Sequence, residues 1–124
     1  MRKVISCKKR ATRIWHAKCC KTIKDLEKMK YTILKRNYRN RRGEIDIIAS
    51  YNRTLVIVEV KARSNNRFGN PIDAIDEIKI NKIKECTKYY LYKEKKQFSE
   101  IRFDVIEIYQ IKEHYVVNHI KNAF

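Results

Sequence analysis

Residues 43–63 read Gly-Glu-Ile-Asp-Ile-Ile-Ala-Ser-Tyr-Asn-Arg-Thr-Leu-Val-Ile-Val-Glu-Val-Lys-Ala-Arg, and this stretch decides the fold of the chain. Two apolar runs rich in β-branched residues flank the polar segment 50–53, a pattern typical of two strands joined by a hairpin turn. The second run is apolar on both faces, which favours a central position in a sheet that is covered on both sides. The stretch therefore predicts a buried hairpin within a larger sheet.

Ionised residues interrupt this apolar hairpin. Because side chains alternate across a strand, the first run is expected to place Glu44, Asp46 and Ile48 on one face and Ile45, Ile47 and Ala49 on the other. Charges in such a place are costly unless they are compensated. One interpretation is a structural ion pair of Asp46 or Glu59 with Lys61. The other is a metal site, in which Asp46 and Glu59 bind Mg²⁺ and Lys61 orients or activates a water that attacks phosphate.

The motifs around these residues resemble those of a known family. Asp46 followed by Glu59-Val60-Lys61 has the form of the PD-(D/E)xK signature. The accompanying motifs, in order, are Asn37-Tyr38-Arg39, Gly43-Glu44-Ile45-Asp46-Ile47-Ile48-Ala49, Val58-Glu59-Val60-Lys61-Ala62-Arg63, Phe68-Gly69-Asn70-Pro71, Arg102-Phe103-Asp104-Val105 and His119-Ile120-Lys121-Asn122-Ala123-Phe124. Over about residues 30–124 the chain resembles the bacterial YraN family of predicted nucleases, whose fold is similar to that of archaeal Holliday junction resolvases.

The resemblance implies an α/β fold in which a restriction-endonuclease-like mixed central sheet is flanked by helices. It also implies a metal-dependent DNA endonuclease that hydrolyses phosphodiester bonds, with branched or recombination and repair DNA as the substrate class. Asp46, Glu59 and Lys61 would then be catalytic, Asp46 and Glu59 would hold Mg²⁺ or Mn²⁺, and Glu44 and Lys79 would support the site. Since many enzymes of this superfamily dimerise to cut two strands, a homodimer is among the expected assemblies.

The chain departs from the family pattern in its first helix, where the family has a Glu that joins the metal site. Counting back from Leu26 places Cys19 at that position. A thiol is a poor ligand for Mg²⁺. The alternative function is therefore a catalytically impaired nucleic-acid-binding module of the same fold. A structural RNA-binding protein would explain the charge but would leave buried Asp46 and Glu59 unexplained.

The charge of the chain indicates a polyanionic partner. Thirty Lys and Arg stand against fourteen Asp and Glu, for a formal net charge of +16. Sixteen of the basic residues and two of the acidic ones lie in residues 1–42. Such an imbalance predicts nucleic-acid binding, here to DNA. The expected contact residues are Arg36, Arg39, Arg41, Arg42, Arg63 and Arg67.

A chain of 124 residues is expected to form a single nuclease-like domain, with residues 1–12 as a flexible basic tail. No apolar run has the length of a membrane span or the form of a secretory signal. The four cysteines, which include the vicinal pair Cys19 and Cys20, have neither zinc-module spacing nor a disulfide framework. The chain is therefore predicted to be cytoplasmic, with no membrane partner.

Periodicity predicts the remaining elements. Helices are expected at 15–29 and 73–93, and further strands at 31–39, 101–109 and 114–119. Lys79 falls on the apolar stripe of the second helix and is expected to point toward the sheet. Asp104 is interpreted as the remaining carboxylate in a strand, with a structural role that pairs it with Arg102 or another basic group.

Overall fold

The computed structural model describes residues 13–63 and 76–124, with side chains described for 20–62, 76–109 and 112–124. The elements in chain order are α1 (Arg13–Lys28), β1 (Thr32–Asn40), β2 (Gly43–Tyr51), β3 (Thr54–Arg63), α2 (Glu77–Glu94), β4 (Glu100–Ile111) and β5 (His114–Ile120). The predicted basic tail, the motif 68–71 and Arg67 lie outside the described residues.

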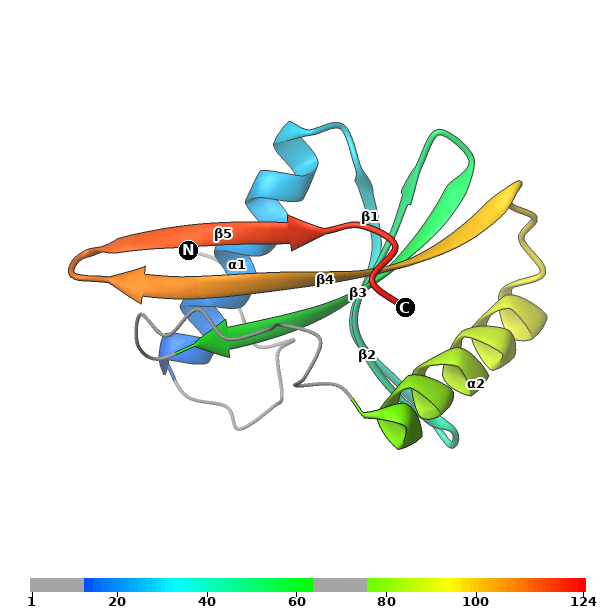
Figure 1. Cartoon of the computed structure of the whole chain (residues 1–124). Coiled ribbons are helices and arrows are strands. Elements are labelled where there is room, and N and C mark those ends of the chain that lie inside the picture. The colour runs from blue at the N-terminus through cyan, green and yellow to red at the C-terminus, as the bar shows by residue number, and fades with distance from the viewer. Residues whose placement is uncertain (1–12, 64–75) are drawn as a thin grey trace.

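The five strands form one mixed sheet in the order β1-β2-β3-β4-β5. Neighbouring strands are antiparallel except β3 and β4, which pair in parallel. A parallel pair needs a crossover connection, and α2 lies within it. In Figure 1, α1 and α2 lie on opposite sides of the strands. The predicted α/β class is confirmed, and the mixed sheet with two described helices is consistent with a restriction-endonuclease-like fold.

Strand β3 is buried on both faces, as its sequence predicts. On the side of α1, Val56, Val58 and Val60 pack with Ile23 and Leu26 of that helix. On the side of α2, the cluster consists of Ile45, Ile48, Leu55, Ile57, Ile83, Cys86 and Tyr90. Burial raises the pKa of the Cys86 thiol to about 11, against a weaker opposing effect of its contacts with Asn40, so this cysteine is a neutral core residue. A strand covered on both faces holds the sheet between two helices.

The prediction that Ile45, Ile47 and Ala49 share one face of β2 is wrong. Ile47 and Ala49 belong to the cluster beside α1, whereas Ile45 packs with Ile48 in the cluster beside α2. Regular alternation would place Ile45 with Ile47. The pairing of β2 with β3 begins only at Ile47, opposite Val58, and Asn37 of the neighbouring β1 has a left-handed φ of 48°. The first residues of β2 stay paired with β1 but lie beyond the ladder with β3, and the alternation breaks between residues 45 and 47.

Element boundaries follow local chemistry. The turn between β2 and β3 consists of Asn52 and Arg53 and is shorter than the predicted segment 50–53. Their φ values of 47° and 67° are those of tight hairpin turns that match the twist of the strands. The second helix begins at Glu77, later than the predicted residue 73, because Asp76 is its N-cap and accepts a hydrogen bond from the backbone N–H of Lys79 at 2.8 Å. No helix within 13–63 or 76–124 is long and apolar enough to cross a membrane.

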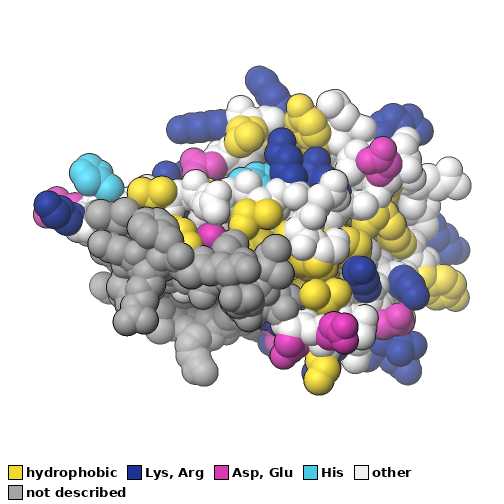
Figure 2. All heavy atoms as spheres, in the orientation of Figure 1, with side chains coloured by type: hydrophobic (Ala, Val, Ile, Leu, Met, Phe, Trp, Pro, Cys, Tyr) yellow, Lys and Arg dark blue, Asp and Glu magenta, His cyan; other side chains and the backbone are white. Residues whose placement is uncertain are grey.

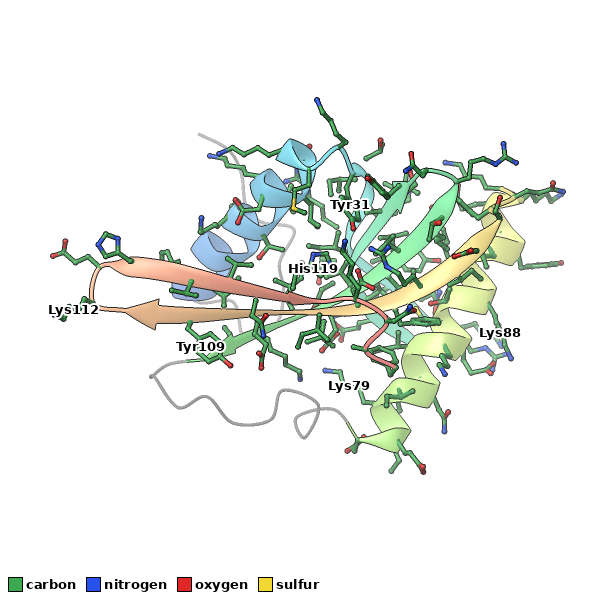
Figure 3. The ribbon with its side chains drawn as sticks, turned by 45° about the horizontal axis from the view of Figure 1, so that its top comes forward. Tyr31, Lys79, Lys88, Tyr109, Lys112 and His119 are labelled. Atoms are coloured by element: carbon green, nitrogen blue, oxygen red, sulfur yellow. The ribbon has the colours of Figure 1, made fainter. Side chains whose placement is uncertain are left out.

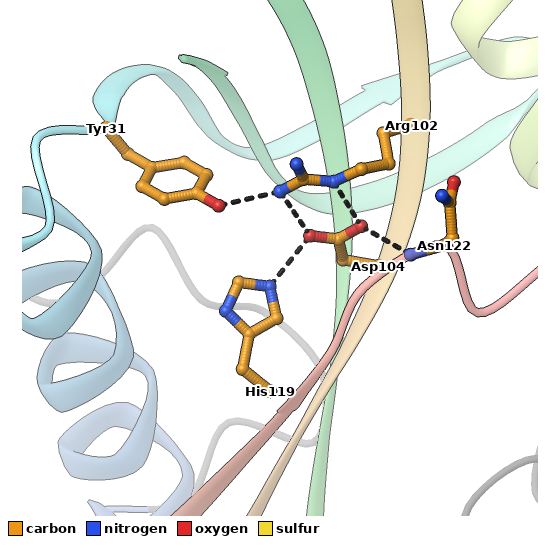
Figure 4. A network of polar contacts seen from close by, with 5 residues as sticks. All are labelled: Tyr31, Arg102, Asp104, His119 and Asn122. Carbon is orange, nitrogen blue, oxygen red and sulfur yellow. Dashed lines mark hydrogen bonds and ion pairs between the residues drawn. The ribbon is translucent and has the colours of Figure 1, made fainter.

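A polar network joins the C-terminal segment to the sheet (Figure 4). Asp104, whose side chain is fully buried, accepts two hydrogen bonds of 2.9 Å from Arg102 and one of 3.1 Å from the backbone N–H of Asn122. His119 Nε2 lies 2.7 Å from Asp104 Oδ2. Arg102 also donates to the hydroxyl of Tyr31 at 2.6 Å. The predicted pairing of Asp104 with Arg102 is confirmed, and it connects β4 with β5 and with the start of β1.

The same contacts determine how Asp104 titrates. Burial by itself raises the pKa of the Asp104 carboxyl, but the hydrogen bonds from His119, Arg102 and Asn122 together outweigh it and lower the pKa below its ordinary 3.8. The folded state therefore gains stability from the ionised carboxylate above that ordinary value. This contribution is lost as the pH falls below 3.8 and through the lower pKa of the folded state.

We expect Asp104→Asn to lower the free energy of unfolding at pH 7 by about 3–5 kcal/mol, because it leaves Arg102 without its buried partner. The variant should also lose less stability than the parent below pH 4. Urea unfolding followed by circular dichroism across a pH series measures both effects. Glu85→Gln is the control, because it removes the exposed pair with Lys88 at 3.2 Å and should cost less than about 1 kcal/mol. Equal losses in the two variants would contradict a structural role for Asp104.

Candidate active site

The candidate site is centred on Glu59, which lies in the middle of the sheet and is 2% exposed. Its Oε2 atom is 2.6 Å from Nζ of Lys79 and 3.7 Å from Nζ of Lys61. Lys61 comes from the same face of β3, and Lys79 comes from the first turn of α2. Figure 3 shows Lys79 extending from α2 toward the strands, whereas Lys88 lies on the outer side of the helix. The predicted inward direction of Lys79 is confirmed, and two cations converge on one buried carboxylate.

Asp46 is held by the backbone of the neighbouring strand. Its side chain accepts a hydrogen bond from the N–H of Val60 at 2.8 Å, and the residue is 5% exposed. The backbone ladder between β2 and β3 ends at the pair Ile47 and Val58, so the Asp46 carboxylate satisfies an amide beyond the end of that ladder. Val60 lies between Glu59 and Lys61 in sequence. The structure therefore fixes Asp46 against the backbone that carries the other two predicted catalytic residues.

The donor chemistry of Asp46 and Glu59 suits a hard divalent ion, since both supply carboxylate oxygens. Within the part of the chain that the structure describes, no group of three or more His, Cys, Asp and Glu residues is arranged to hold a metal. A Mg²⁺ ion bound by one or two carboxylates usually completes its octahedron with water and substrate phosphate. The two predicted ligands fit that pattern. The ion pair of Glu59 with Lys61, which is the alternative interpretation, is also observed. Lys79 is the closer of the two lysines to Glu59.

The other predicted residues lie around the hairpin of β1 and β2. Glu44 forms an exposed ion pair with Arg39, with 3.4 Å between Nη2 and Oε2. The predicted nucleic-acid contacts Arg36, Arg39, Arg41 and Arg42 are all exposed. Basic and acidic side chains are interspersed over the face shown in Figure 2. Arg63 ends β3, but its side chain is not described, and neither is that of Cys19 in α1. The roles of Glu44 and of these arginines stay predictions.

A buried carboxylate that the sequence interpretation overlooked is Glu107 of β4, which is fully buried. It accepts hydrogen bonds from the hydroxyl of Tyr109 at 3.0 Å and from the side-chain amide of Asn118 at 3.1 Å. In the parallel ladder Glu107 lies directly opposite Lys61. Asp104 is therefore not the remaining strand carboxylate. The signal was a single acidic residue inside the apolar run 105–109, the same signal that identified Glu59.

Comparison with known proteins places these residues in one family. Residues 21–108, which run from the second half of α1 to most of β4, match the uncharacterised protein family UPF0102. A UPF0102 protein of Persephonella marina is 42% identical, with 84% of this chain and 86% of that protein covered. UPF0102 proteins of Alkaliphilus oremlandii and Clostridioides difficile are each 46% identical, over 76% and 74% of this chain and 82% and 79% of those proteins. The matched region includes Asp46, Glu59, Lys61 and Lys79.

The contact between Glu59 and Lys79 is testable by a double-mutant cycle. Lys79→Met should lower the free energy of unfolding by about 1–3 kcal/mol, because the buried carboxylate loses its nearer cation. In a Glu59→Gln background the same substitution should cost less than about 1 kcal/mol, since no buried charge remains to be compensated. Denaturant unfolding of the four proteins measures the coupling.

Lys88→Met is the matched control for this cycle, because Lys88 lies on the same helix but forms its ion pair with exposed Glu85. It should show no coupling to Glu59→Gln. Additive effects of Lys79→Met and Glu59→Gln would mean that the 2.6 Å contact contributes nothing to the folded state.

Proposed function

The chain belongs to the uncharacterised protein family UPF0102, and we propose that it is a metal-dependent DNA endonuclease. The observation that carries this proposal is the burial of Glu59 beside Lys61 and Lys79. A fully buried carboxylate in a central strand, beside two lysines, is an expensive arrangement for a fold to maintain. Buried charges of this kind are typical of sites that need a perturbed electrostatic environment. Asp46 supports the proposal, since it supplies a second carboxylate close in space to the same segment of β3.

In this proposal Asp46 and Glu59 hold Mg²⁺ or Mn²⁺ through carboxylate oxygens. The metal, when bound, neutralises charge on the phosphate and lowers the pKa of a bound water. Lys61 orients the attacking water and stabilises negative charge that develops on the phosphate. Lys79, whose ammonium already lies at Glu59, adds a second cation that a phosphodiester can pair with. Branched or recombination and repair DNA is the proposed substrate class, on the resemblance described above.

A second candidate function is a nucleic-acid-binding module without catalysis. Two observations favour it. Glu59 is already compensated by Lys61 and Lys79, so its burial does not require a metal. Cys19 also takes the place of the helix Glu in the family pattern. The basic surface would serve either function equally, so the two functions are distinguished by whether the protein cleaves nucleic acid.

We expect the protein to cleave DNA in Mg²⁺ or Mn²⁺ when single-stranded, duplex, flap and four-way substrates are compared. Asp46→Asn should reduce the rate by about 100-fold or more, because even the outer partners of metal ligands are worth 10–100-fold. Glu85→Gln, an exposed carboxylate on α2, should leave the rate unchanged. Salt-sensitive binding to DNA without cleavage of any substrate would establish the binding module instead.

Position 19 offers a gain-of-function test, since its backbone lies in α1. If Cys19 replaces a ligand, Cys19→Glu restores a hard oxygen donor, and Mg²⁺ affinity and cleavage should rise together. Asp46→Asn in the same background should abolish both gains, because an added carboxylate cannot hold the metal productively without its partner Asp46. Calorimetry with Mg²⁺ and the cleavage assay provide the two readouts. Unchanged Mg²⁺ binding in a folded Cys19→Glu variant would exclude position 19 from the site.

A further inference from the structure

A depression of about 470 Å³ lies between the turn that joins β1 to β2 and the side of α2. Its lining is strongly basic: Arg39, Arg41, Arg42 and Lys82 contribute four cations, against the one carboxylate of Glu44. In Figure 1 the turn between β1 and β2 lies beside the N-terminal half of α2. We propose that this depression is a binding subsite for a backbone phosphate of nucleic acid.

The charges of the depression are only partly compensated. Arg39 pairs with Glu44 at 3.4 Å, and their side chains are 57% and 43% exposed, so this pair is weak. Within the described residues, Arg41, Arg42 and Lys82 have no carboxylate partner within ion-pair distance. A phosphate would supply the missing negative charge, and a guanidinium can donate two parallel hydrogen bonds to it. It would also compete with Glu44 for Arg39.

The depression is built on a fixed backbone. Asn40 donates from its side-chain amide to the carbonyl of Cys86 on α2 at 3.3 Å, and its side-chain oxygen accepts from the N–H of Arg42 at 2.8 Å. Gly43 has a φ of +157°, and a Cβ at that position would lie 3.4 Å from the carbonyl oxygen of Lys82. The turn is therefore tied to α2 by a hydrogen bond and by close approach. Such a preorganised site loses little entropy when it binds an anion.

The position of the depression relates it to the candidate active site. Lys82 follows Lys79 by three residues, so the two lysines are neighbours on one side of α2, about 4.5 Å apart along its axis. Gly43 precedes Asp46 by three residues, at most about 10 Å along β2. At a rise of about 3.4 Å per nucleotide, a strand anchored in the depression would reach the carboxylates within about three nucleotides. This spacing to a scissile bond rests on the proposed function, whereas phosphate binding in the depression does not.

The test compares two triple variants that remove the same charge from opposite ends of α2. One is Arg41→Gln/Lys82→Gln/Arg42→Gln in the depression. The matched control is Arg53→Gln/Lys95→Gln/Lys96→Gln, whose residues are equally exposed but lie at the other end of the sheet and helix. Binding of a fluorescein-labelled single-stranded oligonucleotide to the full chain is measured by anisotropy in EDTA, so that neither metal nor cleavage is involved. Circular dichroism checks the fold of both variants.

We expect the depression variant to lose roughly tenfold or more in affinity at 0.1 M salt and the control to lose less than about threefold. The dependence of log affinity on log salt should flatten by about 0.7 for each phosphate of the single strand that the variant no longer neutralises. Glu44→Gln should bind more tightly than the parent, since it removes the competing carboxylate. Equal losses in the two triple variants would overturn the subsite, because they would reflect net charge alone.

Titration with inorganic phosphate separates a backbone site from a site for free phosphate. The amide signals of Arg42 and Gly43 are followed by ¹H–¹⁵N NMR in the parent and in the depression variant. Phosphate-dependent shifts with unchanged oligonucleotide affinity would overturn the assignment to a nucleic-acid backbone. If the parent cleaves no DNA but the depression variant alone loses binding, the proposed nuclease function fails and the subsite stands. If cleavage is found but the two triple variants bind alike, only the subsite fails.

Discussion

The carboxylate of Glu59 must be compensated by positive charge, because it lies in a strand that is covered on both faces. That constraint determines the relation between the sheet and its second helix. The parallel pairing of β3 with β4 requires a crossover, and α2 lies within it with Ile83, Cys86 and Tyr90 packed on the sheet. The cap at Asp76 places Lys79 in the first turn of the helix, from where it reaches Glu59. The same helix therefore provides both the hydrophobic cover of the sheet and the cation nearest to the buried charge.

Asp104 and Glu59, two of the buried carboxylates of the sheet, differ in how they are satisfied. Asp104 accepts hydrogen bonds from a bidentate guanidinium and a backbone amide and contacts an imidazole, so its geometry is that of a completed structural network. Glu59 is compensated by two lysine ammonium groups whose side chains are 18% and 37% exposed. Lysines on flexible stems can move to a ligand, whereas a bidentate network is costly to open. This contrast is why the centre at Glu59, and not that at Asp104, is the candidate for chemistry.

The basic depression and the carboxylate centre share their supporting elements. Both use the first residues of β2 and the first half of α2, where Asp46 and Lys79 belong to one and Gly43 and Lys82 to the other. The break in alternation near Ile45 lies between them. Binding of phosphate and proposed cleavage of a phosphodiester would then occupy adjacent parts of one surface.

The sequence by itself determined the features that depend on local periodicity. The hairpin of β2 and β3, the burial of β3 on both faces, the inward direction of Lys79 and the pairing of Asp104 with Arg102 two residues away all follow from spacings within one or two elements. Tertiary structure decided the rest. The facing of Ile45, the position of Glu107 opposite Lys61 and the approach of Lys82 to the turn at Gly43 depend on pairings between distant segments. Alternation and helical period give the direction of a side chain within its own element, but the neighbour across a parallel ladder is chosen by how whole elements pack.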